Sequence, residues 1–151
     1  MELITERLIL REFVESDWEA MLAYENKPLY LRYYEWTTRT KEGVQEFIGW
    51  FTAQQQDNPR YKYHLVVTLK DTGRMIGMCG VRKDTFESHK ADIGYELDPD
   101  YWNKGYATEA ARTMLNYGFT HLNAERIWAH CVADNTGSIH VLEKSTTAIR
   151  K

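Results

Sequence analysis

The chain has 151 residues, a formal net charge of -3, 43% hydrophobic residues and 27% charged residues. This length predicts one domain with a buried core, and the composition excludes a disordered chain. Because no apolar run is long enough to span a membrane and the start lacks a signal-peptide pattern, we expect a cytoplasmic protein without membrane contact. The acidic charge argues against a general nucleic-acid partner.

The first third of the chain predicts one strand and two helices. Residues 7–11 alternate around two leucines and predict the strand. The Ser16-x-x-Glu19 spacing predicts a capping box that starts a helix, which Lys27-Pro28 ends. A second helix is expected from Thr40 to about residue 57, where apolar residues recur at helical spacing. The aromatic segment 30–36 shows no clear period, and it either packs over the core or lines a substrate groove.

Strands dominate the middle of the chain. Residues 61–69 alternate, and Asp71-Thr72-Gly73 predicts a turn into a strand over 75–81. After a polar stretch, the strand 91–97 places Asp92 and Glu96 on the face opposite its apolar residues. The two cysteines, Cys79 and Cys131, fall in predicted strands without metal-ligand spacing, so we interpret both as small buried hydrophobes.

The stretch 93–111 carries the strongest functional signal. A strand ends at Asp98-Pro99, a short loop contains Gly105, and an amphipathic helix begins directly afterwards. The first N–H groups of such a helix are unpaired and its dipole is positive there, so the turn can hold an anion. Gly105 leaves the backbone accessible, and Lys104 adds a positive charge. The P-loop and dinucleotide glycine patterns are absent.

The motif Trp102-Asn103-Lys104-Gly105-Tyr106-Ala107 resembles the pyrophosphate loop of the GNAT superfamily of acyl-CoA N-acetyltransferases. The preceding Ile-Gly-Tyr strand and the later Asp134-Asn135-Thr136-Gly137-Ser138 are similar to the RimJ/RimL-like branch, which acetylates protein N-termini and some small amines. The resemblance covers roughly residues 1–144. It implies one GNAT domain over 1–151, with a mixed α/β, mostly antiparallel central sheet flanked by helices, in agreement with the predicted elements.

The resemblance implies a coenzyme site and catalytic candidates. Acetyl-CoA would be the co-substrate, with no metal, and its binding would involve Tyr95, Leu97, Asn103, Lys104, Gly105, Tyr106, Ala107, Thr108 and Asn135. Asn135 would bond the coenzyme near its reactive end and Ser138 would act as or relay the general acid; alternatively, Asn135 caps a helix and Ser138 is a first-turn residue. Either Asp92 or Glu96 could be the base that receives the proton of the amine.

The family pattern breaks after Lys144, where the chain continues for only seven residues. The last one or two C-terminal strands of the fold are therefore expected to be missing, which would leave an exposed sheet edge. Three outcomes stay open: a homodimer or strand exchange covers the edge, the sheet stays short and activity is poor, or the chain is a truncated product.

We expect an acetyl-CoA-dependent N-acetyltransferase that moves an acetyl group to a primary amine by direct attack. A protein N-terminal α-amine suits this chemistry, because its pKa of about 7.7 to 8.0 lies far below that of lysine. The alternatives are a non-catalytic acyl-CoA-binding or interaction domain, or an acetyltransferase for a small amine such as a polyamine or an antibiotic.

Overall fold

The computed structural model of the chain describes residues 1–34 and 38–129. Along these residues a pair of strands comes first, then a run of helices, a run of strands, and a last helix followed by a strand. The strands are β1 (Glu2–Ile4), β2 (Leu8–Glu12), β3 (Lys62–Leu69), β4 (Met75–Lys83), β5 (Lys90–Leu97) and β6 (Arg126–Ala129). The helices are α1 (Trp18–Glu25), α2 (Pro28–Tyr34), α3 (Lys41–Gln54) and α4 (Tyr106–Thr120), with short 3-10 turns η1 (Glu15–Asp17) and η2 (Pro99–Tyr101).

The strands form one sheet in the order β1-β2-β3-β4-β5-β6. Every neighbouring pair is antiparallel except β5 and β6, which run parallel and pair from Lys90 with Arg126 to Ile93 with Ala129. A parallel pair needs a crossover connection, and α4 supplies it. The predicted mixed, mostly antiparallel sheet is therefore confirmed.

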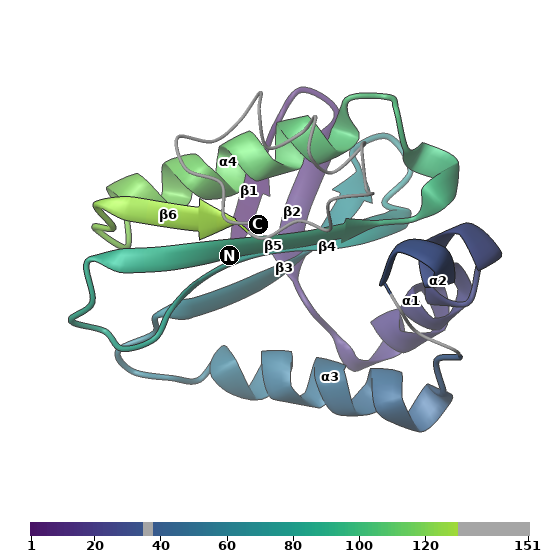
Figure 1. Cartoon of the computed structure of the whole chain (residues 1–151), viewed down its shortest axis with the longest axis horizontal. Helices are drawn as coiled ribbons and strands as arrows, with labels where there is room; N and C mark the ends of the chain where they lie inside the picture. The colour runs from purple at the N-terminus through teal and green to yellow at the C-terminus, as the bar shows by residue number, and fades with distance from the viewer. Residues whose placement is uncertain (35–37, 130–151) are drawn as a thin grey trace.

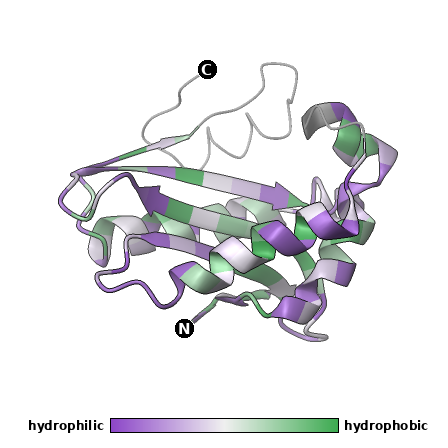
Figure 2. Cartoon of the chain, turned by 90° about the horizontal axis from the view of Figure 1, so that it is seen from below, coloured by the Kyte–Doolittle hydropathy of each residue, from purple (hydrophilic) through white to green (hydrophobic). Residues whose placement is uncertain are grey.

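Helices cover both faces of the sheet, with α4 on one side and α1 and α3 on the other (Figure 1). Two buried clusters result. The α4 side is filled by leucine, isoleucine, valine and alanine side chains, among them Leu65, Val81 and Ile93. The α3 side contains Val44, Ile48 and neighbouring aromatic and methionine side chains. Figure 2 views the molecule from below, where α3 carries both hydrophobic and hydrophilic residues, as expected for a helix with one face on a sheet.

The predicted capping box at Ser16 and Glu19 is wrong, although the helix itself is confirmed. The chain first makes the η1 turn, and α1 begins at Trp18 without a side-chain cap. Asp17 satisfies the backbone here, because its carboxylate accepts from the Val14 N–H at 2.8 Å and pairs with Arg11 at 2.8 Å. Asp17 thus takes the place that the prediction gave to Ser16, and it also ties the turn to Arg11 of β2.

The segment without a clear period begins as a helix, α2, which starts at Pro28. Proline suits a first helical turn, since its fixed φ is already helical and its missing N–H would have no partner there. By contrast, the second predicted helix is confirmed as α3, and the Thr40 hydroxyl caps it by accepting from the Gly43 N–H at 3.1 Å. The strand β1 was not predicted. Within the described residues, no helix is long and apolar enough to cross a membrane.

Candidate active site

The loop between β5 and α4 folds back on the end of β5. The Asp98 carboxylate accepts from the Asp100 N–H at 3.0 Å, which starts the η2 turn. The Trp102 indole donates to the Leu97 carbonyl at 2.9 Å. Asn103 and Gly105 then adopt left-handed backbone geometry, with φ of 61° and 83°. These two residues reverse the chain so that α4 starts beside the end of β5.

The first turn of α4 presents open backbone amides. Gly105 is its N-cap residue and provides no side-chain acceptor. The N–H groups of the first turn lack partners within a helix, and the helix dipole makes this end positive. Lys104 is exposed beside them. The structure therefore brings the predicted coenzyme residues from Asn103 to Thr108 together in one turn, and this turn fits a diphosphate.

Arg7, which the sequence did not single out, braces this loop. Its Nη1 donates to the Lys104 carbonyl at 2.9 Å, and its guanidinium lies 4.2 Å from the centre of the Tyr106 ring. Its Nε pairs with Glu109 at 2.8 Å. Burial acts to raise the pKa of Glu109, but the bonds from Thr5 and Arg7 outweigh it and hold that pKa below its usual value. Arg7 thus holds the loop in place next to the open amides, with its charge balanced by Glu109.

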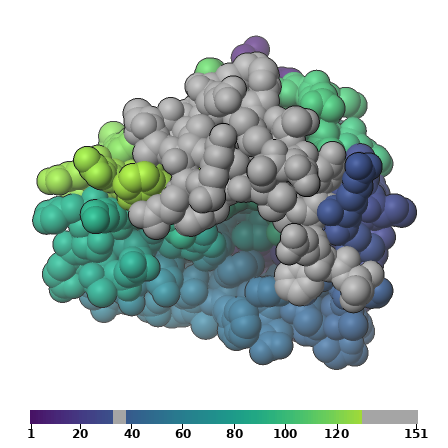
Figure 3. Space-filling model, viewed as in Figure 1, coloured from purple at the N-terminus to yellow at the C-terminus, as the bar shows by residue number. Residues whose placement is uncertain are grey.

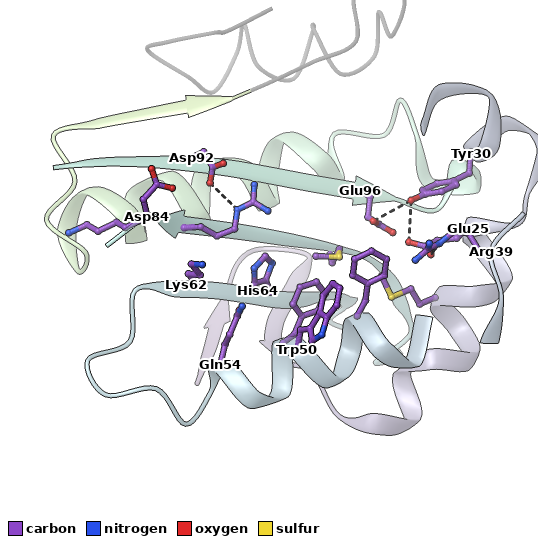
Figure 4. Close-up of a pocket in the computed structure, with 16 residues that line it drawn as sticks. Glu25, Tyr30, Arg39, Trp50, Gln54, Lys62, His64, Asp84, Asp92 and Glu96 are labelled. Carbon is purple, nitrogen blue, oxygen red and sulfur yellow. Dashed lines mark hydrogen bonds and ion pairs between the residues drawn. The ribbon is translucent and has the colours of Figure 1, made fainter. Parts of the chain in front are cut away.

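A pocket of about 520 Å³ lies on the opposite face of the sheet, against α3, and α1 and α2 close one of its ends. In the space-filling view the molecule is hollowed between the blue helix α3 and the teal strands (Figure 3). Trp50 of α3 lines the pocket and is 53% exposed. Figure 4 shows charged groups at both ends of the pocket, with Trp50 between them.

One end of the pocket contains two carboxylates that share a hydroxyl. The Tyr30 oxygen lies 3.1 Å from Glu25 Oε2 and 3.3 Å from Glu96 Oε1. Arg39 pairs with Glu25 at 2.9 Å. The other oxygen of Glu96, Oε2, is buried and has no hydrogen-bond partner. The Tyr24 hydroxyl also faces Glu96, and it is likewise buried without a partner of its own, so it can donate to Glu96 when the carboxylate is ionised.

This environment shifts the protonation of Glu96. Burial, followed by the neighbouring Glu25 carboxylate, raises the pKa of Glu96 well above its ordinary value. Burial and the same two carboxylates also raise the pKa of Tyr24. A carboxyl group with a raised pKa at a pocket is suited to exchange a proton with a ligand near neutral pH.

The other end of the pocket is rich in cations. Arg82 Nε donates to Asp92 Oδ1 at 2.9 Å, and Lys62 also lines the wall. The His64 ring stacks on Phe51 at 4.2 Å. Burial, then the charges of Arg82 and other nearby cations, lowers the pKa of His64 to about 3, so this imidazole is neutral.

The predicted alternation of side chains along β5 is confirmed. Asp92 and Glu96 both line the pocket, whereas Tyr95 and Leu97 pack with the core on the α4 side. Asn135, Ser138 and Cys131 lie outside the described residues, whereas Cys79 is a buried free cysteine. Sequence reasoning missed Glu25, Arg39 and Arg82, because they lie in other elements, far along the chain from the glycine loop.

The chain belongs to the acetyltransferase (GNAT) domain family, whose model matches residues 7–146. It is 35% identical over 144 residues to the uncharacterized N-acetyltransferase YnaD of Bacillus subtilis, covering 95% of this chain and 81% of that protein. A GNAT-family acetyltransferase from Bacillus anthracis has a similar crystal structure, with a TM-score of 0.81 and 33% identity over 95% of this chain and 81% of that one.

A more distant structure shares the fold. It is the spermidine N-acetyltransferase from Vibrio cholerae in complex with CoA and spermine, with a TM-score of 0.75 and 21% identity over 93% of this chain and 80% of that one. The predicted GNAT fold and N-acetyltransferase class are therefore confirmed.

Proposed function

We propose that this chain transfers the acetyl group of acetyl-CoA directly to the α-amino group of a small molecule or a protein N-terminus. The observation that carries the proposal is Glu96, whose buried and unpartnered Oε2 lies in the pocket at the end of the strand that leads into the coenzyme loop. Coenzyme and acceptor would then approach the end of β5 from opposite faces of the sheet.

The diphosphate of the coenzyme would bind the amides at the start of α4. Lys104 would add charge there, Arg7 would hold the loop in place, and Gly105 would let the phosphate approach the backbone. The thioester would lie along the Tyr95 to Leu97 end of β5, where a backbone N–H would stabilise the oxyanion. The resemblance to CoA-dependent relatives supports this arrangement.

Glu96 would act as the base, directly or through one water. The incoming ammonium loses a proton to Glu96, and the neutral amine attacks the thioester carbonyl. The tetrahedral intermediate then collapses and the C–S bond breaks, while the CoA thiolate takes up a proton from a general acid. The nitrogen loses its second proton in the same step, and this proton restores the general acid. Asn135 and Ser138 remain our candidates for positioning the coenzyme and supplying that proton. The products are the N-acetylated amine, CoA and one proton released to solvent.

Thiol release from acetyl-CoA, measured with a panel of amines, tests this function. The panel contains free amino acids, N-terminal peptides, lysine side-chain analogues and polyamines, and mass spectrometry identifies each acetylated product. We expect turnover with at least one α-amine, and a lower rate with amines of higher pKa. Binding of acetyl-CoA without turnover on any amine would instead identify a non-catalytic acyl-CoA-binding domain.

A further inference from the structure

The two ends of the pocket carry groups of opposite charge, and we propose that they bind the two charged groups of one acceptor. The acceptor is a primary amine that also carries a carboxylate a few bonds away, as an amino acid does. Its ammonium group meets Glu96 and its carboxylate meets Arg82. This inference rests on the proposed function, because it names the class of amine that the same site acetylates.

Arg82 is placed to receive an anion. Its guanidinium lies on the backbone of Gly94, since a Cβ at Gly94 would come within 3.0 Å of Arg82 Nη2. Only its Nε is bonded within the described residues, to Asp92, and the side chain is 35% exposed. Both terminal nitrogens are therefore available on the pocket floor. A guanidinium fork of this kind binds a carboxylate through two parallel hydrogen bonds.

The surroundings of Arg82 favour a negative ligand. The lining at this end includes the cations Lys62, Arg82 and Lys83 and the carboxylates Asp84 and Asp92. His64 beside them is neutral, because burial and then the charges of Arg82, Arg60 and Lys62 lower its pKa, so it adds no charge to this end. The positive groups of this end therefore exceed the negative ones. This end therefore disfavours a polyamine, because the second ammonium group of a polyamine would have to lie against these positive groups.

The opposite end favours an ammonium group. Glu96 Oε2 is buried, and the Arg39 guanidinium pairs with the neighbouring Glu25 carboxylate. An ammonium group would add a strong hydrogen-bond donor and would place a positive charge beside ionised Glu96. Tyr24 and Tyr30 are the other titratable groups that face Glu96 from α1 and α2.

The spacing of the two ends fits a compact zwitterion. The guanidinium of Arg82 lies against Gly94. Gly94 and Glu96 are neighbours on one face of β5, roughly 7 Å apart along the strand. Each ion pair spans about 3 Å, so only a few bonds can separate the amine from the carboxylate. Trp50 lies between the ends, and Phe47 and Met78 also line the pocket. They provide an apolar surface for the side chain of the acceptor, so phenylalanine is a suitable probe.

The test compares phenylalanine with phenylalaninamide, which lacks the carboxylate, in the wild type and in Arg82→Gln. We expect Arg82→Gln to lower kcat/KM for phenylalanine by about 30-fold and for phenylalaninamide by less than about threefold, because the substitution removes a charged hydrogen-bond pair from one substrate only. Comparing each substrate with itself cancels the difference in amine pKa. The matched control is Arg126→Gln, at an exposed arginine outside the pocket, which leaves both values unchanged.

Equal losses for both substrates, or no loss for either, would overturn the inference, and so would a preference for spermidine over every amino acid. In all three cases continued acetylation of amines leaves the proposed function standing. Calorimetry with N-acetylphenylalanine and its amide provides a readout without turnover. Preference for the carboxylate, lost in Arg82→Gln, supports the inference even in an inactive protein, and equal binding of the two overturns it.

A comparison of two dipeptides with phenylalanine identifies whether the bound carboxylate is an α-carboxylate or the side chain of an N-terminal residue. Aspartyl-phenylalaninamide carries it on the first side chain, and alanyl-phenylalaninamide does not carry one. A preference for free phenylalanine over both points to an α-carboxylate, whereas a preference for the aspartyl peptide points to an acidic N-terminal residue; either preference must disappear in Arg82→Gln. Equal use of the two dipeptides, together with poor use of phenylalanine, contradicts a carboxylate subsite.

Discussion

At the scale of single residues, the site depends on two buried carboxylates, Glu25 and Glu96, that meet the hydroxyls of Tyr24 and Tyr30. Tyr30 lies within hydrogen-bond distance of both Glu25 and Glu96, and Arg39 pairs with Glu25. Glu96 Oε2 is buried in this cluster. Since burial and Glu25 raise its pKa, Glu96 holds a proton to higher pH than an exposed glutamate does.

Replacing Glu96 by glutamine tests its role as the base. We expect kcat to fall by about 100- to 1,000-fold, a typical loss for removal of a general base, while the KM for acetyl-CoA changes little. In the wild type, log kcat/KM rises with pH as Glu96 ionises, and this rise lies above the usual pH range of a glutamate. Stopped-assay rates between pH 5 and 9 check both effects.

Asp92→Asn provides the contrast, because Asp92 is 43% exposed and bonds Arg82. We expect it to lower kcat far less than Glu96→Gln and to keep the acidic limb of the pH profile. If Asp92→Asn removes that limb and Glu96→Gln does not, then Asp92 is the base and the assignment must be exchanged.

Tyr30→Phe separates positioning from proton transfer. The Tyr30 hydroxyl favours the ionised form of Glu96, so removing it should raise the pKa of Glu96 further. The acidic limb of kcat/KM therefore moves to higher pH, while the rate at the alkaline plateau is largely retained. A uniform loss of rate with no shift of the limb would show that Tyr30 acts in another way.

The residue pattern of β5 allowed the sequence to find Glu96 but not its partners. Strict alternation predicted that Asp92 and Glu96 share a face, and the structure confirms it. Glu25 and Tyr30 meet Glu96 from α1 and α2, and Arg39 from the loop before α3 pairs with Glu25. No local spacing encodes such a meeting, because it results from the packing of the helices against the sheet.

At the scale of elements, Gly105 at the start of α4 has two roles. It adopts a left-handed backbone conformation, and it leaves the helix amides open for the proposed diphosphate. Gly105 has a φ of 83°, which costs a residue with a side chain about 1–2 kcal/mol. The glycine motif and helix periodicity predicted this strand-loop-helix unit from sequence alone. Arg7 could not be predicted as its brace, because β2 meets the loop only in the folded sheet.

Gly105→Ala and Gly73→Ala separate these two roles. Gly73 has a similar φ of 75° in the turn between β3 and β4, and a Cβ there would meet nothing within 4 Å. We expect both variants to lose about 1 kcal/mol of stability, but only Gly105→Ala to weaken acetyl-CoA binding, by about tenfold. Calorimetric titration with acetyl-CoA and thermal unfolding give the two quantities. Unchanged affinity in Gly105→Ala would remove the diphosphate from this turn.

The space around the backbone differs between a glycine of α4 and a glycine of α3, and a second pair of alanine substitutions tests this difference. A Cβ at Gly118 of α4 would come within 2.7 Å of Ile127 Cδ1 and 3.0 Å of Val81 Cγ2. A Cβ at Gly49 of α3 would meet nothing within 4 Å. Gly118→Ala should destabilise the protein by about 1–3 kcal/mol through overpacking, whereas Gly49→Ala should stabilise it by up to about 1 kcal/mol. Urea unfolding distinguishes these opposite signs, and a loss in Gly49→Ala would contradict the open environment of α3 there.

At the scale of the whole molecule, the sheet separates the coenzyme loop from the pocket, and β5 borders both. The coenzyme loop follows β5 and leads into α4 on one face, whereas the pocket lies against α3 on the other (Figures 1 and 4). Because side chains alternate along a strand, consecutive residues of β5 can serve the two sides: Glu96 points to the pocket, and Tyr95 and Leu97 point to the core beneath α4. The hydrophobic periodicity predicted both helix layers, but only the folded sheet shows that the charged ends of the pocket line up along it.

Acid stability of the whole fold should depend on His64, which is packed between α3 and the sheet. Its pKa is about 3 in the folded protein and about 6.5 in an unfolded chain. As pH falls below about 6.5, the unfolded chain binds a proton that the folded protein does not, so stability falls by nearly 1.4 kcal/mol per pH unit until pH approaches 3. His64→Phe keeps a ring against Phe51 but cannot titrate. The carboxyl groups titrate alike in both proteins, so the difference in unfolding free energy between variant and wild type isolates His64. Urea unfolding at pH 7, 6, 5 and 4 should show the variant gaining stability relative to the wild type as pH falls, and parallel curves would mean that the folded protein protonates His64 as readily as the unfolded chain does.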